Sequence, residues 1–186
     1  MKLYIKNMVC NRCIMVVTSE LEKLGLILLS VHLGEVEIAH PISDIQKKEI
    51  AEHLKLFGFE LIDTKNSRTI EKIKTLIIDL VHHKNNQLDT NLSDFIATHM
   101  VQDYNALSNL FSEVAHTTIE KYYIHQKIER VKELLVYDEL SLSEIAFQLN
   151  YSSVAYLSNQ FKKVTGYSPT HFKQIKETKR KQIDEL

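Results

Sequence analysis

The sequence predicts an α+β protein, in which a small N-terminal domain of order βαββαβ precedes an all-α half. Two observations support this prediction. Over residues 2–63, short apolar runs typical of strands alternate with two helical patterns. From residue 67 onward the apolar patterns have helical spacing. The whole 186-residue chain holds only four Gly and two Pro, which favours ordered and mostly helical structure.

The N-terminal elements follow one another closely along the chain. Strands are predicted over residues 2–6, 27–33, 35–39 and 59–63. Gly34 supplies the turn between the middle two strands. One helical pattern runs from Cys13 to Leu24, and Ser43 caps a second helix. Their apolar positions are Ile14, Val17, Leu21 and Leu24 in the first helix, and Ile45, Ile50 and Leu54 in the second. This order predicts a ferredoxin-like sandwich over residues 1–66.

Residues 67–87 are predicted to form a connecting helix and loop. The polar stretch 65–68 marks the end of the N-terminal domain. The apolar positions of the connecting helix are Ile70, Ile73, Ile77, Leu80 and Val81. The helix ends at the polar loop 84–87, so residues 88–186 are predicted to form a separate all-α domain.

The all-α domain contains a pattern typical of a helix-turn-helix. Ser141 caps a short helix whose apolar face is Leu142, Ile145, Ala146 and Leu149. After a turn at 150–152, a second helix has the apolar face Val154, Leu157, Phe161 and Val164. Gly166 ends it, and Pro169 can begin another helix. The outward side of the second helix is small, polar or basic, as on helices that enter the major groove of DNA. An ordinary helical hairpin with a solvated face would also fit this pattern.

Short motifs within this pattern narrow the interpretation. They are Ile145-Ala146, Ser152-Ser153, Phe161-Lys162-Lys163 and Gly166-Tyr167-Ser168-Pro169-Thr170-His171-Phe172. At these spacings they resemble the C-terminal DNA-binding domain of the AraC/XylS family of bacterial transcription regulators, and the resemblance covers Leu92 to Lys173. It implies a sequence-specific regulator whose partner is double-stranded DNA. A homodimer and contact with the transcription machinery are further candidate assemblies.

The motif occurs twice in the chain. Ile96-Ala97, Leu107-Ser108 and Phe111 are echoed by Ile145-Ala146, Leu157-Ser158 and Phe161. Two helix-turn-helix units are therefore expected, joined by a long helical segment from Ile119 to Leu135. In the resembled family such a helix holds two recognition helices in successive major grooves, about 34 Å apart.

The two units differ in the side chains that they offer to DNA. The predicted DNA-binding residues are Asn105 and Asn109 in the first unit, and Ser153, Ala155, Tyr156, Asn159, Lys162 and Lys163 in the second. The first unit also presents Ser112 and Glu113, where the resembled family more often has Arg or Lys, and it has His116 where that family usually has Gly. Further cations follow the second unit at Lys173, Lys176, Lys179, Arg180 and Lys181. We therefore expect the second unit to supply more of the electrostatic affinity.

Composition limits the other classes of protein. The formal net charge is −1, so any positive surface must be local, toward the C-terminus. No basic segment followed by an apolar core opens the chain, and the longest apolar stretch, over 24–33, is too short to span a membrane. We therefore expect a cytoplasmic protein whose two cysteines, Cys10 and Cys13, are reduced thiols.

The two cysteines lie between the first strand and the first helix, in the motif Met8-Val9-Cys10-Asn11-Arg12-Cys13. Thiols at this spacing at a helix N-terminus can converge on one ion, and the helix dipole favours their thiolates. Two soft sulfurs fit Cu(I), or Zn(II) with further ligands. Together with Gly58-Phe59, the motif resembles the heavy-metal-associated domain of copper chaperones and metal-transporting ATPases, with Asn7 in place of a common Gly.

Other interpretations remain open at this stage. The N-terminal domain could serve only in dimerisation or partner binding, with its cysteines a vestige. The whole chain could be a cytoplasmic metal-binding chaperone with a helical interaction module, although the doubled helix-turn-helix pattern favours a regulator. An enzyme is not expected, because the sequence has no Gly-rich phosphate loop, no Gly-x-Ser-x-Gly elbow and no identifiable His partner for a Cys nucleophile.

Overall fold

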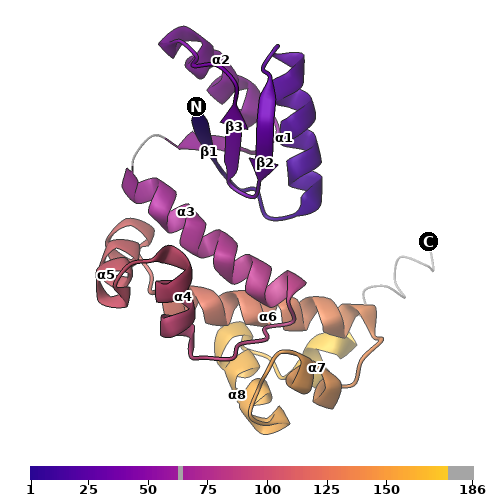
Figure 1. Cartoon of the computed structure of the whole chain (residues 1–186). Helices are drawn as coiled ribbons and strands as arrows, with labels where there is room; N and C mark the ends of the chain where they lie inside the picture. The colour runs from indigo at the N-terminus through magenta and orange to yellow at the C-terminus, as the bar shows by residue number, and fades with distance from the viewer. Residues whose placement is uncertain (63–64, 176–186) are drawn as a thin grey trace, which may run out of the picture. The chain divides into compact units, whose positions relative to one another are not determined.

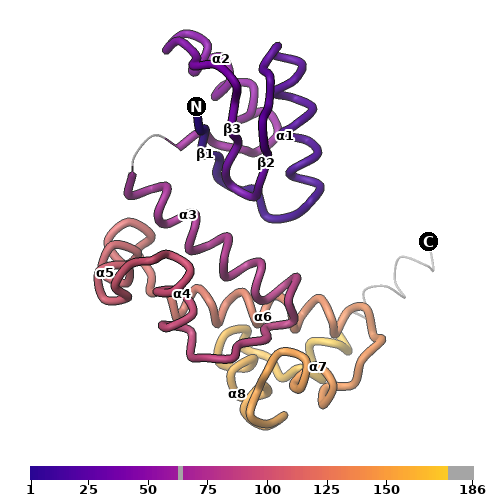
Figure 2. Tube along the Cα trace, viewed as in Figure 1, coloured from indigo at the N-terminus to yellow at the C-terminus, as the bar shows by residue number. Residues whose placement is uncertain are grey.

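A computed structural model describes residues 1–62 and 65–175. The contacts between its residues divide the chain into two compact parts, and Figures 1 and 2 label most of the helices and strands in chain order. The first part comprises Met1–Leu76 and Asn109–His116. The second part comprises Ile77–Ser108 and the residues from Thr117 onward.

The N-terminal part begins with the predicted order βαββαβ. Its elements are β1 (Lys2–Lys6), α1 (Asn11–Lys23), β2 (Leu28–His32), β3 (Glu35–Ile38), α2 (Asp44–Lys55) and β4 (Glu60–Ile62). The strands form one antiparallel sheet in the order β2-β3-β1-β4. Gly34 turns the chain between β2 and β3 with φ of 79°, which Gly adopts without steric cost. Asp63, predicted to end the last strand, lies outside the described residues.

The alternation of side chains along β1 separates the two faces of the sheet. Leu3 and Ile5 are buried in a core that includes Val17 and Leu21 of α1 and Ile50 and Leu54 of α2. Because successive strand residues point to opposite faces, Tyr4 faces the other side, where the guanidinium of Arg68 lies 4.5 Å from its ring centroid.

The prediction that Ile45 belongs to the apolar face of its helix is wrong. Ile45 is 80% exposed, whereas Ile50 and Leu54 are buried. Ile45 precedes Ile50 by five positions, so at 3.6 residues per turn it points about 140° away from it. Ile50 and Leu54, four positions apart, share the side that meets the sheet.

The connecting helix begins earlier than its apolar pattern indicated. Helix α3 spans Lys65–Ile78 and continues into a π-helical turn, η1 (Asp79–His83). The polar stretch 65–68, predicted to mark a domain end, therefore forms the first turn of this helix. All five predicted apolar positions, from Ile70 to Val81, are buried. Polarity at the start of α3 thus reflects exposure rather than a break in the helix.

The remaining helices agree with the predicted double helix-turn-helix pattern. They are α4 (Leu92–Met100), α5 (Tyr104–Ala115), α6 (Ile119–Tyr137), α7 (Leu142–Gln148) and α8 (Val154–Thr165), and residues 169–175 are helical as well. Ser141 forms a capping box with Glu144 at the start of α7, and Gly166 ends α8 with φ of 83°. Among the described residues, no helix combines the length and apolarity that a membrane crossing needs.

Each helix-turn-helix unit places a left-handed residue after each of its two helices. In the second unit these residues are Asn150 (φ 53°) and Gly166, which favour this conformation. In the first unit they are Val101 (φ 52°) and His116 (φ 53°). A left-handed conformation costs an L-residue about 1–2 kcal/mol, and a β-branched side chain is an outlier there. Val101 therefore strains the backbone of the first helix-turn-helix unit more than Asn150 strains that of the second.

We predict that replacing Val101 by Asn stabilises the protein by about 1 kcal/mol, because Asn tolerates the left-handed conformation and Val does not. Val101 is 87% exposed, so the replacement removes little packing. The reciprocal control, Asn150→Val, should destabilise by a similar amount. Urea unfolding of the full chain measures both changes. An unchanged unfolding midpoint for both variants would contradict the assignment of strain.

Candidate nucleic-acid interface

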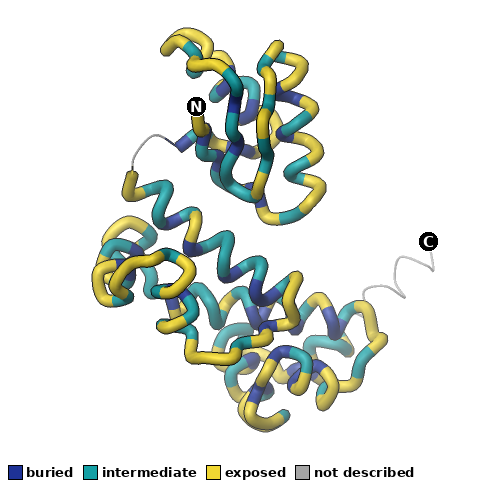
Figure 3. Tube along the Cα trace, in the orientation of Figure 1, coloured by how far each residue is buried: buried dark blue, intermediate teal, exposed yellow. Residues whose placement is uncertain are grey.

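The apolar face of α8 is buried against α6 and α7. Leu157 and Phe161 have no exposed surface, and they share a core with Ile145 of α7 and with Ile128 and Val131 of α6. Figure 3 shows buried positions recurring along α8 with exposed positions between them. Because the faces of a helix are fixed relative to one another, burial of this face leaves the opposite face in solvent.

The outward face of α8 carries the predicted DNA-binding residues of the second unit. All six are exposed: Ser153, Ala155, Tyr156, Asn159, Lys162 and Lys163. Ser153 is also the N-cap, and its Oγ accepts a hydrogen bond of 3.1 Å from the backbone N–H of Tyr156. Lys162 and Lys163 lie in the last turn, where their charge also interacts favourably with the helix dipole.

In the first unit, the predicted residues lie along α5. Asn105 and Asn109 are exposed, Ser112 is half-buried and Glu113 is exposed. Asp103 caps this helix, since its Oδ1 accepts a hydrogen bond of 3.0 Å from the backbone N–H of Ala106. The outward residues of α5 therefore offer amide groups and a negative charge, whereas α8 offers amide, phenol and ammonium groups.

Lys173 is half-buried and forms an ion pair with Asp138 at the end of α6. Its charge is thus partly committed within the protein. The further cations predicted to aid DNA binding, Lys176, Lys179, Arg180 and Lys181, lie outside the described residues. Among the described residues, the electrostatic argument for the second unit rests chiefly on Lys162 and Lys163.

A buried polar network lies under the turn of the second helix-turn-helix. Lys127 of α6 is 7% exposed, and its Nζ lies 3.6 Å from the ring centroid of Tyr151 and 5.5 Å from that of Tyr123. The hydroxyl of Tyr123 donates to Oδ1 of Asn86 at 2.5 Å. Asn86 is 1% exposed, and its Nδ2 donates to the carbonyl oxygen of Leu149 at 2.8 Å. The loop before α4 is thereby tied to α6 and to the end of α7.

The sequence patterns do not single out this network as functional. The two copies of the repeat nevertheless differ in spacing, which indicates that the two turns differ. Ile96 and Leu107 are 11 positions apart, whereas Ile145 and Leu157 are 12 apart. The second turn therefore holds one more residue than the first. In the second turn, Tyr151 and Ser152 lie between the left-handed Asn150 and the N-cap Ser153. In the first turn, only Gln102 lies between the left-handed Val101 and the N-cap Asp103.

Cys10 and Cys13 lie together at the N-terminus of α1. The helix begins at Asn11, two residues before the predicted start, so Cys10 is its N-cap and Cys13 lies in its first turn. Both residues are half-buried and their Sγ atoms are 3.5 Å apart. The backbone N–H of Cys13 is the largest influence that lowers the pKa of the Cys10 thiol, and the charge of Arg12 adds to it. This environment favours the thiolate, which is the form that binds metal ions and reacts with oxidants.

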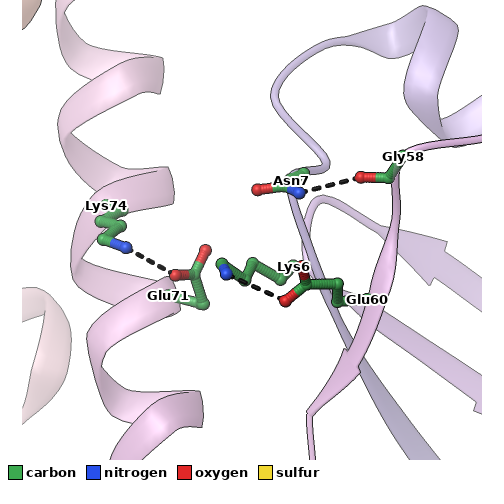
Figure 4. Close-up of polar contacts among 6 residues, drawn as sticks. All are labelled: Lys6, Asn7, Gly58, Glu60, Glu71 and Lys74. Atoms are coloured by element: carbon green, nitrogen blue, oxygen red, sulfur yellow. Dashed lines mark hydrogen bonds and ion pairs between the residues drawn. The ribbon is translucent and has the colours of Figure 1, made fainter. Parts of the chain in front are cut away.

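The residues just before the cysteines have structural roles. Met8 is 2% exposed and packs in the apolar core, so its thioether is committed to packing. Asn7 has φ of 72°, and its Nδ2 donates to the carbonyl oxygen of Gly58 at 2.8 Å, as Figure 4 shows. Since Asn tolerates a left-handed backbone better than other non-Gly residues, it can stand where the resembled domain commonly has Gly.

The same close-up shows an ion pair beside this bond, Lys6 with Glu60 at 2.9 Å, and another on α3, Lys74 with Glu71 at 2.8 Å. Among the described residues, no group of three or more His, Cys, Asp or Glu side chains is placed to hold a metal ion. The candidate metal ligands that the sequence predicts remain Cys10 and Cys13.

The match to a family of known proteins lies in the helical half of the chain. Residues 96–175 match the model of a helix-turn-helix domain. YtdP, an HTH-type transcriptional regulator of Bacillus subtilis (strain 168), is 23% identical over 117 residues, which are 62% of this chain and 15% of that protein. The chain thus matches only a small part of YtdP.

Two solved structures are similar in fold. The C-terminal domain of AraT, a response regulator from Geobacillus stearothermophilus, is 24% identical with a TM-score of 0.52, and the match covers 60% of this chain and 88% of that one. The DNA-binding domain of AdpA, a global transcriptional factor solved in complex with a target DNA, is 18% identical with a TM-score of 0.51, over 59% and 96% of the two chains. Residues 96–175 are thus similar to a helix-turn-helix domain, and the chain is similar in fold to both solved domains.

Lys127 gives a prediction about pH. Burial lowers its pKa to about 8 from the ordinary 10.5. Between these values the folded state binds fewer protons than the unfolded state, so the free energy of unfolding must rise with pH. Relative to Lys127→Met, the native chain should gain about 2 kcal/mol between roughly pH 7.5 and pH 10. Denaturant unfolding of both proteins at each pH measures this gain, and a difference that does not change with pH would show that Lys127 is not desolvated.

Proposed function

We propose that the chain is a sequence-specific DNA-binding transcription regulator of the AraC type, with α8 as its principal recognition helix. The observation that carries this proposal is the exposed polar and basic face of α8, set opposite the fully buried Leu157 and Phe161. A helix presented in this way beside a shorter helix is the arrangement that enters a major groove. The similarity in fold to the DNA-binding domain of AdpA, solved in complex with a target DNA, supports it.

The chemistry of the exposed side chains divides the contacts into two kinds. Lys162 and Lys163 neutralise phosphates, which sets affinity without reading sequence. Asn159 and Tyr156 lie nearer the N-terminal half of α8 and offer hydrogen bonds to base edges, and an Asn amide matches adenine in the major groove. The small side chains of Ser153 and Ala155 allow close approach at the start of the helix.

The first unit supplies polar readout through Asn105 and Asn109. Glu113 on the same helix repels phosphate, so the first unit contributes less electrostatic affinity than the second. The two units together make one subunit a reader of two neighbouring half-sites, as in the resembled family.

We predict that Lys162→Ala with Lys163→Ala lowers affinity for selected and random DNA alike and reduces the salt dependence of binding. Asn159→Ala should instead reduce preference at one base step by about 1–3 kcal/mol. Binding titrations of the full chain with a sequence selected from a random duplex pool measure both effects. Asn105→Ala is a matched control, because it should change the base preference in the other half-site, which the first unit reads. If Asn159→Ala left the selected sequence unchanged, Asn159 would not be a base reader.

For the N-terminal domain we propose a ferredoxin-like fold of the heavy-metal-associated type, in which Cys10 and Cys13 hold one soft cation. The βαββαβ order, the strand order β2-β3-β1-β4 and the separation of 3.5 Å between the two Sγ atoms support this proposal. The lowered pKa of Cys10 favours the ligating thiolate. Two thiolates suit a low-coordinate Cu(I), and Zn(II) would need further ligands. In a reducing cytoplasm, such a site would link metal level to regulation.

We predict that the reduced chain binds one equivalent of Cu(I) and that the Cys10→Ser, Cys13→Ser variant does not. Anaerobic titration with Cu(I) and separately with Zn(II), followed by ultraviolet absorption of the thiolate-metal bond, measures binding without reference to DNA. Repeating the DNA titration at each metal level tests a coupling of about 1–3 kcal/mol between the two ligands. Equal metal uptake by both proteins would exclude the site. Uptake with unchanged DNA affinity would leave a metal-binding domain without a sensing role.

A further inference from the structure

We propose that Tyr151 is a positioning residue that determines specificity, because it fixes the rotation of α8 about its own axis. The inference rests on the proposed function, and it concerns which base steps Tyr156 and Asn159 meet. Tyr151 lies in the turn before α8, outside the helix that it controls, and it is only 8% exposed.

Tyr151 holds α8 at two points. Its hydroxyl donates to Oε1 of Gln160 at 2.8 Å. Its ring centroid lies 6.0 Å from that of Tyr156, with the ring planes inclined by 55°, a geometry in which aromatic rings attract. Tyr156 and Gln160 are four positions apart, so both contacts fall on one flank of the helix, one turn from each other. Two points on one flank define the angle at which the helix presents its outward face.

Tyr151 is itself held from the side of α6 and α7. The ammonium of Lys127 lies 3.6 Å from the centroid of the Tyr151 ring, and a cation removed from water is attracted to the face of an aromatic ring. The backbone N–H of Tyr151 donates to the carbonyl oxygen of Ala146 at 2.8 Å. Asn86 secures the preceding carbonyl of Leu149. The ring is therefore anchored to the body of the domain rather than to α8 alone.

Burial of Leu157 and Phe161 does not by itself give this precision. Apolar burial is non-directional, whereas a hydrogen bond weakens when its distance or angle departs from a narrow range. With side chains included, a helix has a radius of about 5–6 Å, so a rotation of about 10° moves a side-chain tip by about 1 Å. A shift of that size breaks a bidentate contact to a base. It leaves a contact between a flexible lysine and a phosphate intact.

We call the contacts of Tyr151 with Gln160 and Tyr156 the clamp. The turn of the first helix-turn-helix unit has no equivalent of the clamp. Only Gln102 lies between Val101 and the N-cap Asp103, and it is exposed. Loss of the clamp should therefore change the base preference in the half-site that α8 reads. It should leave the base preference in the half-site of the first unit unchanged. This difference between the halves separates a positioning role from a general loss of stability.

The test uses the full chain and a duplex selected from a random pool, with single-base variants of each half-site. Tyr151→Phe removes only the hydroxyl that bonds Gln160, and Gln160→Leu removes the same bond from the side of α8. For each variant, discrimination between the selected base and its alternatives in the α8 half-site should fall about fivefold or more, the size of one good base contact. Affinity for random duplex should stay the same. The double variant should lose no more than either single variant.

Tyr104→Phe is the matched control, because it removes a phenolic hydrogen bond to Glu120 at the first unit and should leave the α8 half-site unaffected. Unfolding midpoints of all variants establish that each is folded. Undiminished discrimination in both Tyr151→Phe and Gln160→Leu would overturn the clamp while the proposed function stands. A native chain that prefers no sequence would overturn the proposed function and, with it, this inference.

Discussion

The complete burial of Leu157 and Phe161 is the constraint on which the DNA-binding account depends. These side chains lie four positions apart and pack with residues of α6 and α7, so they decide which face of α8 remains in solvent. The tyrosine, asparagine and two lysines that could meet DNA occupy that remaining face. Leu107 and Phe111 are buried at the corresponding positions of the first unit. A repeated apolar step thus orients two helices whose outward chemistry differs.

Apolar packing and polar contacts perform different tasks in the second helix-turn-helix. Packing supplies most of the free energy but little angular precision. The network of Asn86, Tyr123, Lys127, Tyr151 and Gln160 supplies directional contacts. The network carries a cost, because desolvation penalises the charge of Lys127. In the first unit, Val101 occupies a left-handed position at a backbone cost that Asn150, at the corresponding position of the second unit, largely avoids. The turn of the second unit is therefore the less strained of the two, and this network holds it.

Local patterns in the sequence predicted the parts of the fold that local forces determine. The βαββαβ order, the cap at Ser141, the stop at Gly166 and the exposed face of α8 all follow from periodicity, capping and glycine conformation. The start of α3 and the exposure of Ile45 did not follow, because polarity and apolarity are weak guides near helix ends. The bond from Asn86 to Leu149 joins residues 63 positions apart. A contact between residues so far apart in the sequence produces no periodic pattern. Only the longer spacing of the second repeat indicated that its turn differs from the first.

The central claim is that the outward face of α8 enters a groove of duplex DNA. Photocrosslinking from position 156 tests it most directly, with Tyr156, which is 53% exposed, replaced by a photoreactive phenylalanine analogue in the full chain. The same replacement at Phe147 of α7, 88% exposed, gives the reference for an aromatic residue outside the recognition face. The account predicts crosslinks from position 156 to bases within one half-site of a selected duplex, and few from position 147. Crosslinks to bases from position 147 and none from position 156 would contradict it.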